Sequence, residues 1–582
     1  MLKTVSNKFV LIVLLSCVSL AGCSSKDDEK GKVDLSAAGD ILQYVPADSP
    51  YVLASIAPLP DDVMDKLEPN IDRMLLSYET LLQELFAMAS EEALKEGGDN
   101  EDLEKAGAVV DELSTLMSLE GLRGAGFDRE SLAVVYGNGL LPVLRLEVTD
   151  GHLFEEALMR LESSAGEEMD VLKLAGNAVR YIDADEIRVL VAVLDKQVAI
   201  AMAPVGFTNG QLEVLLGFSM PAESIIESGK LQAIADKYSF NDYMLGYFDL
   251  EAVAKTVTGD ARGLDADIFE AFGDAEELSD VCRNEIRSMA GIAPRVVMGY
   301  TDISTERFDS QAILELRSDI AEGLTGVSAE VPGLGGDMGG LFSFGMSLDL
   351  RELREFVEVQ LDAIEKDPFE CEDFADIQAG AAQARVSLAQ PVMPMIYDFR
   401  GFSAIIENVE GLDMATQSPP TSIDGRFLMA MDNAPAFVAL GTMFSPELAG
   451  MNLQPDSTPV LLDIPQAQML GGDAYAALSE DALALSIGDG AEARLGTMLA
   501  ADASDEGIFL NFSMDAERYY TFMGEAMAEA KHDDENPMTP AFQEAMQDIM
   551  LAIAAMYDRM SVDMRFTEDG IVMENRISLG DE

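Results

Sequence analysis

A module that runs from a strand directly into a helix occurs three times, and it constrains the fold of this chain more than any other sequence feature. The copies cover residues 245–253, 344–353 and 510–518, and each carries an aspartate near the junction. A carboxylate at that position can accept hydrogen bonds from free helix amides and meets the positive end of the helix dipole. We therefore predict that helix capping, and not catalysis, is the role of Asp249, Asp349 and Asp515.

Two further patterns occur once in each half of the chain. Residues 191–202 and 475–486 each read as a hairpin followed by a short helix with leucines, and residues 295–317 and 560–579 read as hairpins that close each half. Helices are interleaved with these strands, but hairpin connections outnumber long crossovers. The pattern predicts an α+β fold of two tandem, duplicated domains with mainly antiparallel sheets and packed helices.

The N-terminus has the features of a secretory signal. Lys3 and Lys8 form a basic region, residues 9–20 form an apolar run that is short for a bilayer, and small residues precede a cysteine. The sequence Leu20-Ala21-Gly22-Cys23 resembles the lipobox of bacterial lipoproteins. This resemblance implies cleavage before Cys23 and lipid attachment to that cysteine, and it makes a membrane-spanning helix the weaker interpretation.

The lipobox also implies a location. Two or more acyl chains hold a protein durably on a membrane, so the membrane is an expected partner through Cys23. Ser24 stands where many Gram-negative lipoproteins that stay at the inner membrane have an aspartate. The resemblance therefore implies an outer-membrane protein that faces the periplasm.

These signals together give an expected domain organisation. A glycine-rich stretch, residues 333–340, marks the boundary between the two halves. We expect a signal peptide at 1–22, a lipidated flexible tether at 23–38, a first α+β domain at 39–318, a glycine-rich joint at 319–340 and a second α+β domain at 341–582.

The chain is extremely acidic. It contains 105 acidic and 38 basic residues, for a net charge of −67, and the acidic residues occur in every segment. This balance excludes nucleic acid as a partner, because phosphate binding requires clustered lysine and arginine. We interpret the acidity as an adaptation of the whole surface to solubility or salt, with capture of cations or of a basic partner as the alternative.

Two cysteines are left in the body of the protein. Cys17 leaves with the signal peptide and Cys23 carries lipid, so Cys282 and Cys371 remain. In an oxidising compartment such a pair predicts one disulfide, which here would join the two halves across the joint. A metal pair or a catalytic redox pair is less favoured, because no histidine lies nearby and no Cys-x-x-Cys motif is present.

Known catalytic motifs are missing from the sequence. The two histidines, His152 and His532, lie in surface-like contexts, and no nucleophile elbow, phosphate loop or dinucleotide fingerprint occurs. The acidic clusters at 183–186 and 533–535 do not match a calcium-binding loop, so we interpret them as solvated turns. We expect no cofactor, no metal and no enzymatic activity.

A methionine-rich apolar stripe lies near the C-terminus. It can be the buried face of a core helix or the wall of a groove for an apolar ligand, and we favour the core helix. Its members are Phe542, Met546, Ile549, Met550, Ile553, Met556, Tyr557 and Met560.

The body of the chain gives little direct information on function. Residues 45–51 and 227–238, with the strand that starts at Tyr243, resemble a family of uncharacterised bacterial envelope proteins, which supplies no activity. We expect a non-enzymatic binding or scaffolding module that acts on an unidentified envelope protein or apolar ligand. The alternative is a carrier of a lipid or other apolar ligand, and a carboxylate-dependent hydrolase is a remote third.

The anchor can be tested directly. Replacing the acylated thiol by Cys23→Ser should release the protein from the membrane fraction, because a serine hydroxyl does not receive the lipid. Fractionation followed by immunoblotting measures this. Unchanged sedimentation with membranes would contradict the lipoprotein prediction.

Overall fold

The computed structural model describes residues 33–580, except for 96, 98–99, 273–277, 412–419, 445–451, 463–466, 468–471, 504–506 and 530–538. The predicted signal peptide, the lipobox with Cys23, and the segment with His532 and residues 533–535 lie outside the described residues.

Helices of very different lengths occur along the whole described chain. The α-helices are α2 (Gly39–Leu42), α3 (Asp61–Lys95), α4 (Asn100–Ser114), α5 (Leu119–Gly124), α6 (Gly151–Ala165), α7 (Asn209–Leu215), α8 (Ile225–Ser228), α9 (Lys230–Tyr238), α10 (Leu250–Lys255), α11 (Leu264–Phe272), α12 (Asp280–Ala290), α13 (Ser318–Thr325), α14 (Leu350–Lys366), α15 (Ala375–Leu388), α16 (Ala434–Phe444), α19 (Ala491–Leu499), α20 (Ala516–Glu529) and α21 (Pro540–Met556). A π-helical turn lies at Thr256–Asp260, and 3₁₀ turns lie at Glu372–Phe374 and Pro394–Asp398.

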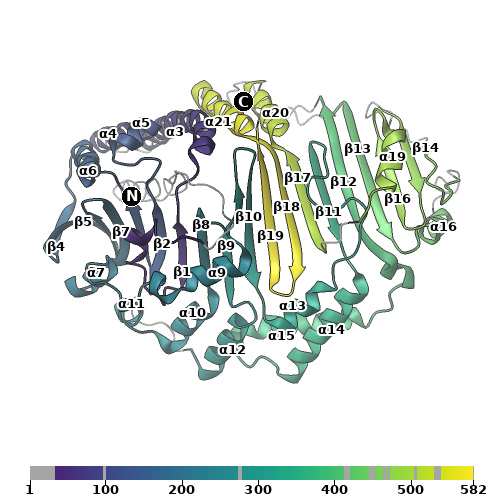
Figure 1. The fold of residues 1–582 in the computed structure, drawn as a ribbon, viewed down its shortest axis with the longest axis horizontal. Coiled ribbons are helices and arrows are strands. Elements are labelled where there is room, and N and C mark those ends of the chain that lie inside the picture. The colour runs from purple at the N-terminus through teal and green to yellow at the C-terminus, as the bar shows by residue number, and fades with distance from the viewer. Residues whose placement is uncertain are drawn as a thin grey trace.

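The strands of the described residues form a single 19-stranded sheet, and every pair of neighbours in it is antiparallel (Figure 1). The first half contributes, from its outer edge to the centre, β4 (Asp170–Leu174), β5 (Asn177–Ala184), β6 (Ile187–Val193), β7 (Gln197–Pro204), β3 (Leu141–Glu147), β2 (Ala133–Asn138), β1 (Tyr51–Ser55), β8 (Met244–Asp249), β9 (Arg295–Ile303) and β10 (Arg307–Glu315). The second half continues with β19 (Gly570–Leu579), β18 (Tyr557–Thr567), β17 (Ile508–Asp515), β11 (Phe342–Ser347), β12 (Phe399–Glu410), β13 (Ser422–Met431), β16 (Ala482–Ile487), β15 (Ala474–Leu478) and β14 (Val460–Leu462).

The α+β class and the antiparallel pairing are confirmed, but the two halves do not build separate sheets. The two closing hairpins pair with each other, because β10 and β19 run antiparallel from Arg307 opposite Ser578 to Glu315 opposite Gly570. Each strand would otherwise present a row of unpaired amide and carbonyl groups. This central pairing makes the sheet continuous between the halves.

Most helices gather at the two ends of the strands (Figure 1). One group contains α3, α4, α5, α20 and α21, and the opposite group contains α10 to α15. In the first group α21 of the second half packs on α3 of the first half, with Ile549 and Ala545 against Leu81. Within the predicted methionine-rich stripe, Ile549 and Met556 of α21 are buried, and Phe542, Met546 and Ile553 pack beside them, as expected for a core helix. Tyr557 and Met560 are instead part of strand β18.

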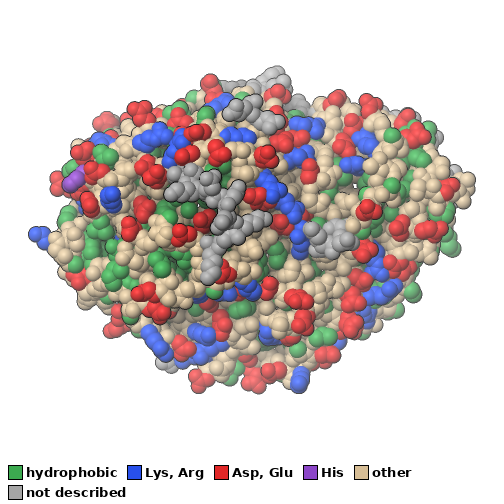
Figure 2. Space-filling model, viewed as in Figure 1, with side chains coloured by type: hydrophobic (Ala, Val, Ile, Leu, Met, Phe, Trp, Pro, Cys, Tyr) green, Lys and Arg blue, Asp and Glu red, His purple; other side chains and the backbone are tan. Residues whose placement is uncertain are grey.

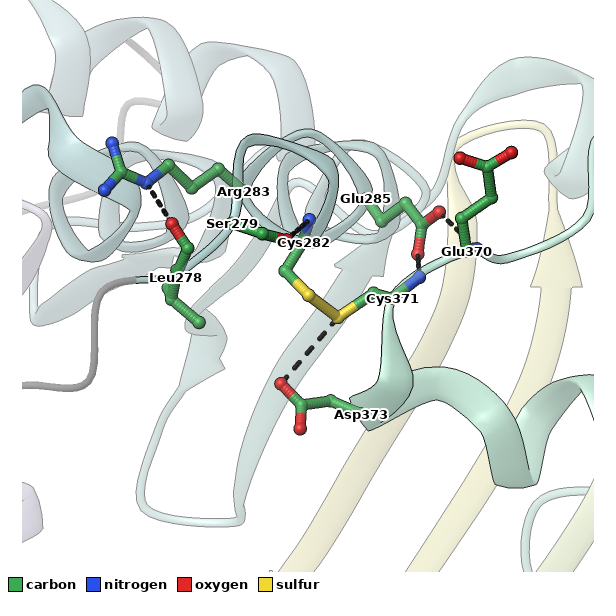
Figure 3. Close-up of a disulfide and its surroundings, with 8 residues drawn as sticks. All are labelled: Leu278, Ser279, Cys282, Arg283, Glu285, Glu370, Cys371 and Asp373. Carbon is green, nitrogen blue, oxygen red and sulfur yellow. Dashed lines mark hydrogen bonds between the residues drawn. A yellow bond between two sulfur atoms is a disulfide. The ribbon is translucent and has the colours of Figure 1, made fainter.

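The opposite group also joins the two halves. Cys282 in α12 forms a disulfide with Cys371, which follows α14 (Figure 3). Beside it, the Glu285 carboxylate accepts hydrogen bonds from the backbone amides of Glu370 at 2.7 Å and Cys371 at 3.1 Å. The segment between residues 319 and 340 lies between these cysteines in sequence, so the bond closes a loop around it.

The two faces of the sheet are covered differently. On the first, here called the covered face, the chain around Ile41 and Val45 and helix α9 pack on the first half of the sheet. On the second half of the same face, Val331, Leu334 and Met338 are buried against strand residues such as Leu428. The glycine-rich joint is thus a packed layer on the sheet and not an exposed linker.

The folded core already includes the last residues of the predicted tether at 23–38. Val33 and Ala38 are buried in the core of the first half. Within the described residues, none of the helices combines the length and the apolar character needed to cross a membrane.

The disulfide should contribute measurably to stability. The double variant Cys282→Ser/Cys371→Ser should lower the free energy of unfolding by about 4 kcal/mol, because the bond closes a loop with a sequence separation of 89 residues. Urea unfolding monitored by circular dichroism measures this. Reduced wild-type protein is the control and should unfold at the same urea concentration as the variant, and an unchanged midpoint would contradict the prediction.

Candidate functional site

The face of the sheet opposite the covered face, here called the open face, carries a continuous row of apolar residues. Successive members are direct cross-strand partners from β1 to β16, so they form one line across eleven strands. This methionine row consists of Leu53, Gly246, Met298, Ala312, Met573, Met564, Leu510, Met346, Phe402, Met429 and Leu483. At a strand spacing of roughly 4.8 Å it is about 48 Å long.

An aromatic row lies beside the methionine row in the second half. Its members, from β18 to β16, are Val562, Phe512, Phe344, Ala404, Phe427 and Leu485. The rings of the two rows touch, because the ring centroid of Phe402 lies 5.8 Å from that of Phe344 and 5.9 Å from that of Phe427. The two rows therefore make one continuous apolar surface.

This surface is in contact with solvent. Six large apolar side chains of the open face are between 37% and 40% exposed: Leu53, Phe248, Phe344, Ile406, Phe512 and Met573. Single exposed apolar residues are normal on soluble proteins, whereas a contiguous apolar patch marks an interaction site. All six lie on one face of one sheet, and four of them, Leu53, Met573, Phe344 and Phe512, are members of the two adjoining rows. The two rows therefore form such a patch.

Covering elements bound the open face on several sides. At the first-half edge α6 packs Phe154 and Leu158 onto Val191 and Val198. At the second-half edge Ala434 of α16 packs with Met431 and Leu478. At one end of the central strands α3 and α21 cover Ile303 and Leu579. Among the described residues, nothing covers the area between β1 and β13 in the middle of the sheet in this way.

The covered face has a polar centre that holds the glycine-rich segment in place. Asp563 is 1% exposed and accepts hydrogen bonds from Asn511 Nδ2 at 2.7 Å, Arg576 Nη1 at 2.7 Å and the amide of Gly336 at 3.2 Å. Both carboxylate oxygens of Asp563 accept hydrogen bonds, so this side chain holds the glycine-rich segment against the sheet. Burying a charge is tolerated only when its partners are in place in this way.

A small cavity of about 160 Å³ lies beside this centre. Its lining includes Arg307, Asp309, Arg559 and Arg576. Burial raises the pKa of the Asp309 carboxyl, and the nearby Arg307 guanidinium acts in the opposite direction. The arginines pair with carboxylates of the protein itself, such as Arg559 with Asp337 at 2.7 Å, so we interpret the cavity as part of the structural network.

The aspartates of the repeated module cap helices, as predicted. Asp249 accepts from the amide of Ala252, Asp349 from those of Arg351 and Glu352, and Asp515 from that of Arg518.

Among the described residues, the other sequence candidates do not assemble into a site. His152 is exposed at the start of α6. Asp183 of β5 forms a two-pronged ion pair, at 2.7 and 2.8 Å, with Arg188, its cross-strand partner in β6. Asp373 lies near Cys282 and Cys371, but both sulfurs are bonded to each other and so are not thiolate ligands (Figure 3).

The sequence interpretation did not identify the open face. The alternation in Phe342–Ser347 was a usable signal, because it places phenylalanine, phenylalanine and methionine on one side and small residues on the other. Alternation does not reveal which side of a strand stays uncovered.

Comparison with known proteins gives no relative for this chain: no family model, no curated protein and no solved structure matches it. The functional argument therefore depends on the geometry and on the sequence motifs of this chain.

The polar centre predicts a large effect of a single substitution. Asp563→Ala should lower the free energy of unfolding by about 3 kcal/mol, because it removes a buried carboxylate that accepts hydrogen bonds from Asn511, Arg576 and the amide of Gly336. The matched control Asp337→Ala removes a half-exposed carboxylate and should cost less than about 1 kcal/mol. Urea unfolding of both variants measures the difference, and equal midpoints would contradict the prediction.

Proposed function

We propose that this protein is a lipid-anchored envelope protein on the periplasmic side of the outer membrane, and that it binds an apolar or amphiphilic ligand on the open face. The observation that carries the proposal is the group of six exposed apolar side chains on one face of the sheet. A water-facing apolar surface of this kind is unfavourable unless a ligand or partner covers it. Binding through this face fits a non-enzymatic module.

The composition of the open face supports binding of a ligand with an adaptable shape. Five of the eleven members of the methionine row are methionines. Methionine is unbranched and polarizable, so it adapts to irregular apolar surfaces. The phenylalanines of the aromatic row add large apolar contact areas.

The location rests on the lipobox. Acylation at Cys23 would hold the folded body near the membrane, and only residues 24–32 separate that cysteine from Val33, the first described residue in the core. An extended chain of nine residues spans at most about 30 Å. The folded body would therefore lie close to the membrane surface.

We also propose that the two halves arose by tandem duplication. Outward from the centre, β10, β9, β8, β1, β2, β3, β7, β6 and β5 match β19, β18, β17, β11, β12, β13, β16, β15 and β14, with the same chain order in both sets.

Matched residues support the same proposal. Asp249 of β8 pairs across the strands with Arg295, and Asp515 of β17 pairs with Arg559. The boundaries at 318 and 341 stay a prediction.

Photolabelling tests the binding face. A photoactivatable long-chain alcohol should label peptides of β1, β8, β11 and β17 in the membrane-anchored protein, as mapped by mass spectrometry. The variant Phe344→Asp/Met573→Asp should reduce this labelling at least fivefold, because it places charges on the apolar rows.

The matched control is Leu76→Asp. Leu76 is 46% exposed but lies on α3, outside the open face, so its replacement should leave the labelling unchanged. Circular dichroism checks that each variant is folded. Labelling that is spread evenly over exposed apolar residues of helices and sheet would contradict the proposal.

A further inference from the structure

Several of the helices at the two ends of the strands carry a net negative charge. At one end of the strands α3 carries nine carboxylates against three basic side chains, and α21 carries two carboxylates and no basic side chain. At the other end α14 carries five carboxylates against three basic side chains. Figure 1 shows these helices at the two ends of the strands, and Figure 2 shows acidic side chains, in red, over both ends of the molecule. The apolar surface of the open face thus has net negative charge at both ends of its strands.

An apolar surface flanked by negative charge favours some ligands of the open face over others. A second copy of the chain is disfavoured, because each whole chain carries a net charge of −67 and two copies repel each other strongly. Lipids with anionic headgroups and acidic proteins are disfavoured for the same reason. A positively charged amphiphile has an apolar side that can lie on the apolar rows. Its charges complement the acidic helices at the ends of the strands.

The dimensions favour a helix. Layers of helix on sheet are a standard way to cover an apolar sheet face. The last two members of the methionine row, Met429 and Leu483, pack beside α16. The part of the row from Leu53 in β1 to Phe402 in β12 is about 38 Å long, which equals a helix of about 26 residues at 1.5 Å per residue. Grooves lined with adaptable methionines are suited to the apolar side of an amphipathic helix.

Building on the proposed function, we infer that the occupant of the open face is a basic amphipathic helix of another protein or peptide. Its apolar side lies on the methionine and aromatic rows, and its lysine and arginine side chains face the acidic helices at the ends of the strands.

A designed peptide tests this inference. The probe is a fluorescent 28-residue helix of leucine and lysine with leucine at helical spacing on one side. The matched probe has glutamate in place of every lysine. Fluorescence anisotropy measures the binding of both to the full protein anchored in phosphatidylcholine nanodiscs, with empty nanodiscs as the background.

We expect the basic probe to bind at least tenfold more tightly than the acidic probe. Raising the salt concentration from 0.05 to 0.5 M should weaken its binding at least fivefold, because the charges of the acidic helices are screened. The variant Phe344→Ser/Met573→Ser should weaken it at least tenfold without changing any charge, whereas Leu76→Ser should have no effect. The bound basic probe should also protect the open face from photolabelling.

Other outcomes overturn the inference. Equal binding of both probes, or binding that is insensitive to salt, would show that the acidic helices do not attract a basic ligand. Protection of the open face by phosphatidylcholine vesicles but not by the basic probe identifies a lipid as the occupant. If photolabelling still maps to the open face while the basic probe fails to bind, this inference fails and the proposed function stands; if the labelling fails as well, both fail.

Discussion

The antiparallel pairing of β10 with β19 is the interaction on which the rest of the structure depends. It joins the closing hairpins of the two halves over nine residue pairs and turns two strand systems into one sheet. Without it each half would end in an open edge strand, which is prone to pair with other chains. Because the sheet is continuous across the centre, the apolar residues of the two halves form one surface.

The two halves also contact each other at both ends of the strands, outside this central pairing. The helices of the second half pack on the first half where α21 meets α3, and Arg73 forms an ion pair there with Asp548 at 2.5 Å. At the opposite end α12 of the first half is bonded to the second half through Cys282 and Cys371. The two contacts resist bending of the sheet about its centre, so the open face is held as one surface.

The two faces of the sheet differ in what covers them, and only one of them leaves apolar side chains exposed. The covered face buries a core in the first half and a polar network around Asp563 in the second, both beneath segments that precede the first strand of each half. The open face has apolar rows in the same strands but no such segment over its middle among the described residues. The exposed rows are therefore a consequence of which side the preceding segments occupy.

Local chemistry could be predicted from the sequence, and non-local pairing could not. The caps at Asp249, Asp349 and Asp515, the core role of the methionine-rich helix and the hairpins depend on residues close in the chain. The joining of the halves into one sheet depends on contacts between residues more than 250 positions apart, such as Arg307 and Ser578. Alternating strands such as Phe342–Ser347 allow either face to be covered, so only the tertiary structure decided which apolar face stays open.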